Sequence, residues 1–333
     1  MKERVQSLDA IRGCAIILVV ATHALAYMYV EAEKTIEFWV VTVAVPPFFL
    51  VDGYLFLDAL RKTSEFSYGK YIRKSARRLL LPWLIFTVLY GVLRAAFEYK
   101  GFLDPKIIID HDLLDILSVA YYSQISAQMY FLLSLFLIRS WSFVTKLLAT
   151  MKPLWIVMIW VGYTISWASI APTFKNHDGF DPIFYAFWGF QYYLAGMALY
   201  VYRKVVDKYA WAYAIAAVLL FLILKTIPGA SPVLTQYSYI FTVYFMIMAC
   251  HTYATFLAVL GKYTMGIFLF HAPVILKGAT VIVPPLAPGS ELLQYVLVVA
   301  VTLSVSLLAA KLCTIIPYGP MVLGEGSKAR QVL

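Results

Sequence analysis

Long apolar stretches alternate with short polar segments along the whole chain. An α-helix needs about 20 predominantly apolar residues to cross a bilayer. The pattern therefore predicts an all-α, polytopic membrane protein with about ten transmembrane helices. The expected spans are 13–30, 38–60, 79–97, 128–149, 154–172, 183–202, 210–228, 235–258, 264–283 and 292–313. Segment 113–126 is expected to form a short re-entrant or interfacial helix.

The polar segments between these spans alternate in charge. Lysine and arginine gather at the N-terminus, in segments 61–78 and 203–208, and at the C-terminus. Aspartate and glutamate gather in segments 31–37 and 98–115. Cytoplasmic loops of membrane proteins carry the excess of basic residues. We therefore expect both termini in the cytoplasm, which agrees with an even number of spans.

Composition supports the same class of protein. The chain has 333 residues, of which 62% are hydrophobic and only 14% charged. The net charge of +9 resides in the basic loops and does not indicate nucleic-acid binding. No linker or soluble domain is visible, so we expect one integral-membrane domain over 1–333 with a frayed tail from about 320 to 333. The three cysteines form no paired motif, and no metal site is expected.

The first apolar stretch carries three ionisable groups on one helical face. Arg12 and His23 lie eleven residues apart, which is about 1100° of rotation, or close to three turns. Asp9 lies one turn before Arg12. His23 is expected near the bilayer midplane, where an ionisable side chain is costly and therefore predicts a functional site. The alternative is that His23 makes a polar contact between helices.

Three other ionisable residues are expected at a similar depth, roughly 10–14 Å above the cytoplasmic face. These residues are Asp52, His251 and His271, each in a different span. Side chains of this kind at one level predict a shared polar cavity. We rank His23 first as a catalytic candidate, His271 second and Asp52 third, and leave His251 open.

The basic segment before the third span ends in a cluster of arginines. Arg73 and Arg77 would share a helical face, and Arg78 follows directly. One interpretation is a topology anchor with affinity for anionic lipid. The other is a binding site for the phosphates of a cytoplasmic donor, because arginine forks suit phosphate oxygens. The residues alone leave both interpretations open.

The opening run from Ser7 to Gly13, which reads SLDAIRG, and His23 after it resemble the opening signature of acyltransferase family 3. Members of that family are bacterial membrane acyltransferases, many of which O-acetylate cell-surface sugars. Weaker motifs of the family are similar to segments 48–56, 71–79 and 260–271. Two positions depart from the family pattern. Asp52 stands where the family usually has serine, and segment 128–132 replaces a run that often reads His-Leu-Trp.

The resemblance implies an acyl-CoA-dependent O-acyltransferase, most simply an O-acetyltransferase, in the bacterial cytoplasmic membrane. The donor would be acetyl-CoA or another acyl-CoA, and the acceptor a sugar, glycolipid or polysaccharide of the cell envelope. We expect His23 to act as general base on the acceptor hydroxyl, because an imidazole titrates near neutral pH. Asp52 or Asp9 would orient it. The donor phosphates would be held by Arg12, Arg73, Arg77 and Arg78.

Other interpretations remain at this point. A transporter or flippase for a glycan or small solute would also carry ionisable residues inside the membrane. Such a protein often shows inverted repeats, and none is evident here. A non-catalytic subunit of an envelope assembly is a third possibility. Acidic and histidine side chains of the outer loops are expected to be ordinary solvated residues rather than acceptor contacts. They are Asp110, His111, Asp178 and Asp181.

Overall fold

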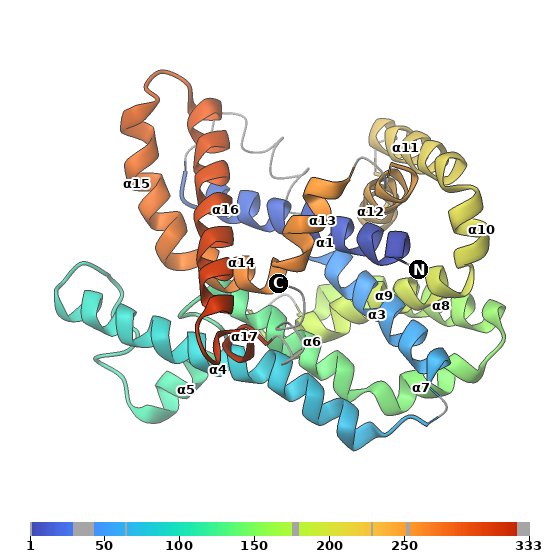
Figure 1. Ribbon diagram of the computed structural model, residues 1–333, viewed down its shortest axis with the longest axis horizontal. Coiled ribbons are helices and arrows are strands. Elements are labelled where there is room, and N and C mark those ends of the chain that lie inside the picture. Colours follow the sequence, from blue (N-terminus) through green and yellow to red (C-terminus); the bar gives the residue numbers. More distant parts are fainter. Residues whose placement is uncertain are drawn as a thin grey trace. The chain divides into compact units, whose positions relative to one another are not determined.

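The computed structural model describes residues 2–28, 43–63, 65–174, 180–227, 229–250 and 254–324. Every regular element in these ranges is a helix, which confirms the all-α class (Figure 1). The elements are α1 (Lys2–Leu25), α3 (Pro46–Lys62), α4 (Tyr68–Tyr99), α5 (Leu113–Tyr121), η1 (Ala127–Met129), α6 (Tyr130–Ser140), α7 (Ser142–Thr150), α8 (Pro153–Ile170), η2 (Ala171–Phe174), α9 (Pro182–Val201), α10 (Arg203–Lys208), α11 (Ala210–Thr226), α12 (Pro232–Ala249), α13 (Thr255–Lys262), α14 (Thr264–Phe270), the π-helical turn η3 (His271–Ile275), α15 (Leu276–Leu286), α16 (Glu291–Ile315) and α17 (Gly319–Val322).

Helices occupy the described part of every expected span. Within the described ranges, five helical stretches are long and apolar enough to cross a membrane. A sixth is the pair of segments Ala127–Ser140 and Ser142–Thr150, which is bent by 53°. The chain is thus a helical membrane protein, while the number of ten spans and the cytoplasmic termini stay predictions. His251 and Asp178 lie outside the described residues.

The first helix extends beyond the expected membrane span on its N-terminal side. α1 begins at Lys2 and ends at Leu25, whereas the expected span was 13–30. Asp9, Arg12 and His23 therefore lie on one helix, as expected, and His23 lies in its last turn. Hydropathy marks only the membrane-compatible part of a helix, which can continue through polar residues.

Two compact units make up the chain, and both are discontinuous in sequence. The first unit contains 1–62, 151–162 and 192–310, and the second contains 63–150, 163–191 and 311–333. In the first unit, α1 packs against several other elements, namely α3, α12, α13, α14 and α15. One apolar cluster of this unit joins Ala24 and Leu25 of α1 to Leu276 of α15 and Val298 of α16.

Glycines allow two helix pairs of the first unit to approach closely. A Cβ atom on Gly13 would collide with the backbone of Leu257, and one on Gly261 would collide with the backbone of Asp9. α1 and α13 therefore cross with a small residue on each side, as membrane helices often do. α3 and α9 cross in the same way through Gly53 and Gly196.

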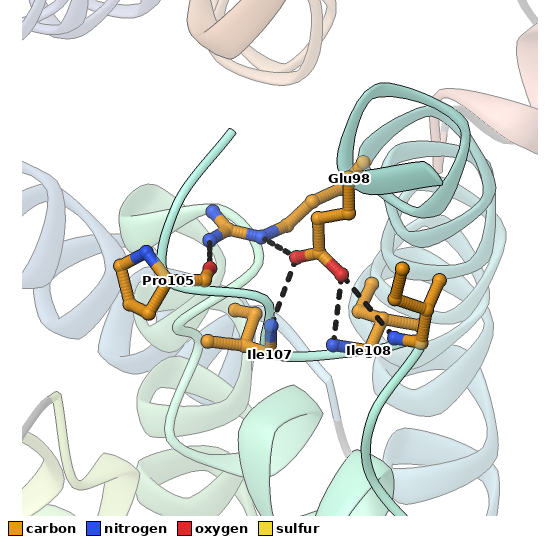
Figure 2. A network of polar contacts seen from close by, with 6 residues as sticks. Glu98, Pro105, Ile107 and Ile108 are labelled. Carbon is orange, nitrogen blue, oxygen red and sulfur yellow. Dashed lines mark hydrogen bonds and ion pairs between the residues drawn. The ribbon is translucent and has the colours of Figure 1, made fainter. Parts of the chain in front are cut away.

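In the second unit, a buried carboxylate organises the loop that follows α4 (Figure 2). Glu98 is fully buried and accepts hydrogen bonds from the backbone N–H groups of Ile107, Ile108 and Ile109 at 3.0–3.2 Å. Arg94 lies one helical turn earlier and pairs with the same carboxylate at 2.8 Å. Glu98 therefore serves as a structural anchor for this loop.

Fraying was expected from about residue 320, but the structure has a short packed helix at this position. α17 covers Gly319–Val322, and Leu323 is fully buried. Gly324 adopts a φ of +69° and lies against the backbone of Arg78 on α4. Residues 325–333 lie outside the described ranges, and the expectation of a single domain over 1–333 stays a prediction.

Candidate functional site

Helix α1 carries polar side chains in two places, Asp9 with Arg12 in its N-terminal half and His23 in its last turn. Arg12 pairs with Asp9 at 3.3 Å, and both side chains are partly buried. Lys262 of α13 is near enough to act electrostatically on the Asp9 carboxylate. This neighbourhood follows from the close crossing of α1 and α13, which brings Gly261 against Asp9. The result is one carboxylate with two cations beside it.

The last turn of α1 brings His23 to a second predicted site residue. The rings of His23 and His271 lie 5.1 Å apart between centroids and are tilted by 50°. These are the two highest-ranked catalytic candidates from the sequence, and they come from segments almost 250 positions apart. His271 is fully buried, whereas His23 is only partly buried. An accessible imidazole thus lies against a buried one.

A break in the helical chain directly follows the buried imidazole. Ala272, directly after His271, has φ −131° and ψ 151°, which is outside the helical region. Nδ1 of His271 lies 2.8 Å from the Phe268 oxygen and 3.2 Å from the Ile267 oxygen, both one turn earlier in the helix. Because a carbonyl oxygen only accepts, Nδ1 must carry the proton.

The tautomer of His271 leaves its other nitrogen as a hydrogen-bond acceptor. With Nδ1 protonated, a neutral ring presents a lone pair at Nε2. Among the described residues, Nε2 is buried and has no hydrogen-bond partner. A buried polar atom without a partner is uncommon and calls for an explanation, such as a catalytic function. The neighbouring His23 ring is a group with which Nε2 could interact.

The break after His271 was not predicted from the sequence. Its signal was Pro273, which has no backbone N–H and therefore cannot continue the helical ladder. A second polar contact near the histidines was also missed. The hydroxyl of Tyr295 on α16 donates to the carbonyl oxygen of Ala21 at 3.0 Å. This bond connects α16 to α1 one turn before its end.

Asp52, the third catalytic candidate, is buried on α3. It precedes Gly53, the residue at the crossing with α9, and its helix packs on α1. The expected role of Asp52 in orienting His23 stays a prediction. The expected role of Asp9 is less well matched, because Asp9 pairs with Arg12 three turns or more before His23.

The candidate donor-binding arginines belong to different units. Arg12 lies in the first unit, and Arg73, Arg77 and Arg78 lie in the second. The latter three occupy the N-terminal part of α4 with exposed side chains, so Arg73 and Arg77 share a helical face as predicted. Their role in donor binding stays a prediction.

Of the residues expected in outer loops, Asp181 has structural contacts of its own. Asp181 accepts a hydrogen bond from the backbone N–H of Ile183 at 2.9 Å, at the start of α9, and from the hydroxyl of Tyr121 at 3.5 Å. Burial and the negative charge of Asp181 raise the pKa of Tyr121 above its usual range. Asp110 and His111 are exposed, as expected of solvated loop residues.

This geometry defines the protein as a helical membrane protein that has a pair of histidines at a helix break. A family model described as an acyltransferase domain, that of acyltransferase family 3, matches residues 5–311. The chain therefore belongs to acyltransferase family 3, and it is a membrane acyltransferase. No curated protein and no solved structure matches the chain. The transporter and accessory-subunit interpretations gain no support from this assignment.

Proposed function

We propose that the chain transfers an acyl group, most simply acetyl, from cytoplasmic acyl-CoA to a hydroxyl of a cell-envelope sugar or glycolipid. His23 is the general base in this proposal, and His271 is the residue that positions it. The observation that carries the proposal is the histidine pair, 5.1 Å between ring centroids, with Nδ1 of His271 committed to main-chain carbonyls. A base held by a second, fixed group is the usual arrangement for activating a hydroxyl.

In this mechanism the two imidazole rings have different roles. Nε2 of His271, which has no hydrogen-bond partner among the described residues, would accept the N–H of His23 during the reaction. This bond would fix the tautomer of His23 and leave its other nitrogen as the base. That nitrogen takes the proton of the acceptor hydroxyl. The oxygen attacks the thioester carbonyl carbon, the carbon–sulfur bond breaks, and the proton passes to the departing coenzyme A thiolate. The products are an O-acyl ester and free coenzyme A.

Cationic side chains would hold the donor. Arg12 is kept in place by Asp9, with Lys262 close by. Arg73, Arg77 and Arg78 on α4 form a second group of exposed cations. Guanidinium groups bind phosphate oxygens in a two-pronged geometry, which suits the nucleotide and diphosphate of coenzyme A. In the first unit, Asp52 is a further candidate for balancing charge at His23.

Transfer can be tested in bacterial inner-membrane vesicles that contain the overexpressed chain. Acetyl-CoA labelled in the acetyl group is supplied on the cytoplasmic side, and envelope glycans are isolated. We expect alkali-labile label in the glycans, because an O-ester is cleaved by mild base. Vesicles with His111→Ala provide the matched control, since His111 is an exposed loop histidine. Equal labelling in vesicles with and without the chain would contradict the proposal.

A further inference from the structure

Two arginines of the first unit share one tyrosine ring. Arg61 lies in the last turn of α3, and Arg203 is the first residue of α10. The guanidinium carbon of Arg203 lies 4.2 Å from the ring centroid of Tyr200, and that of Arg61 lies 5.7 Å from it. The two cations are therefore separated by no more than the sum of these distances.

The tyrosine ring that both arginines contact is held in place by packing. Tyr200 lies at the end of α9 and is only 3% exposed. Tyr54 of α3 packs against it edge to face, with centroids 5.2 Å apart. Nη1 of Arg203 also donates to the carbonyl oxygen of Tyr200 at 3.2 Å. Packing thus limits the motion of the Tyr200 ring, and this hydrogen bond limits the motion of the Arg203 guanidinium.

Asp58 on α3 and Asp207 on α10 each lie about one helical turn from one of these arginines, but neither forms an ion pair with it. Within the part of the chain that the structure describes, neither Arg61 nor Arg203 has a carboxylate partner. The nearby Asp58 pairs instead with Lys62 at 2.6 Å. Contact with the aromatic face attracts each cation, but it leaves the net charge unchanged. Two like charges at such a separation repel, and a bound anion would relieve this repulsion.

We propose that Arg61 and Arg203, together with the hydroxyl of Tyr200, bind a phosphate group. Each guanidinium offers parallel N–H donors to two phosphate oxygens, and a phenol hydroxyl adds another donor. A role only as topology anchors would require basic residues at these helix ends but would not require both at one ring. The phosphate belongs to a soluble ligand or to the headgroup of an anionic phospholipid. This site involves none of the residues assigned to acyl transfer and does not depend on that function.

The test uses the full chain in lipid nanodiscs and two variants. The first is the pair Arg61→Gln and Arg203→Gln. The second is the pair Lys204→Gln and Lys208→Gln, which removes the same charge from the exposed side of α10. One arm measures the affinity for inorganic phosphate by isothermal titration. The other measures retained phosphatidylglycerol by native mass spectrometry, with phosphatidylcholine as the neutral reference.

We expect the arginine pair to lower binding at least tenfold in one arm, because charge-assisted hydrogen bonds are lost, and the lysine pair to change it less than threefold. Loss in the first arm identifies a soluble phosphate ligand, and loss in the second identifies a lipid. Equal changes for both pairs in both arms would overturn the proposal. If the glutamine pair does not fold, Arg61→Lys with Arg203→Lys decides, because it keeps the charge and removes the planar fork.

Discussion

His271 allows its structural and positioning roles to be separated by two substitutions. The amide nitrogen of asparagine can replace the donor Nδ1, and the amide oxygen of glutamine can reach towards the position of the acceptor Nε2. His271→Asn therefore keeps a donor for the Phe268 carbonyl, which lies 2.8 Å from Nδ1 in the wild type, and loses Nε2. His271→Gln has the opposite effect. The two variants have similar polarity, so each controls for the other.

The magnitudes follow from these contacts. His271→Gln removes the imidazole donor from the Phe268 carbonyl, which should cost about 0.5–1.5 kcal/mol of unfolding free energy. His271→Asn keeps this donor and should be the more stable of the two variants. Its transfer rate should nevertheless fall by about 10²-fold or more, because the proposed acceptor that fixes the tautomer of His23 is lost. Stability and rate should thus change in opposite order in the two variants.

Two assays on purified protein decide this prediction. Unfolding in denaturant gives the stability of each variant, and single-turnover transfer from labelled acetyl-CoA gives the rate per folded molecule. If His271→Asn transfers at the wild-type rate, Nε2 has no part in the reaction. In that case His271 would only complete the hydrogen bonds at the helix break.

Three further predictions concern packing and charge. Gly13→Ala should destabilise the protein by about 1–3 kcal/mol, because its Cβ would collide with the backbone of Leu257. Gly162→Ala is the control, since a Cβ atom at that position would have no neighbour within 4 Å and should not destabilise the protein. Thermal melting of the two variants tests this difference. Glu98→Gln should lower the free energy of unfolding by about 2–4 kcal/mol and speed hydrogen exchange at the amides of 107–109, since one acceptor oxygen is lost. Unchanged exchange would refute the role of Glu98 as an anchor of this loop. Neutralising Arg73 and Arg77 should weaken coenzyme A binding, more strongly in low salt, and an unchanged affinity in folded protein would leave them as topology anchors.

Periodicity and depth arguments from the sequence predicted the helices and placed the two main histidines at one level. Hydropathy identifies long apolar runs reliably, and each expected span corresponds to helical structure in its described part. The depth estimate also placed His23 and His271 together, and their rings are in contact. This agreement reflects the regular rise of an α-helix, which converts sequence position into height.

Tertiary contacts could not be predicted in the same way. The role of Glu98 depends on three amides of a loop that folds back on it, so the sequence alone placed it only within the acidic segment 98–115. Gly13 and Gly261 have meaning only once α1 and α13 cross. The departure of Ala272 from helical geometry, directly after His271, is a feature that apolar periodicity does not register.

The central claim is that His23 is the base for acyl transfer. The most direct measurement is single-turnover transfer from labelled acetyl-CoA to envelope glycans by His23→Ala, normalised to folded protein by size-exclusion and thermal melting. His111→Ala, an exposed loop histidine, is the matched control. We expect His23→Ala to lose about 10²–10⁴-fold in rate while it folds and binds coenzyme A normally, and the control to keep its rate. A near-normal rate for folded His23→Ala would contradict the proposed mechanism.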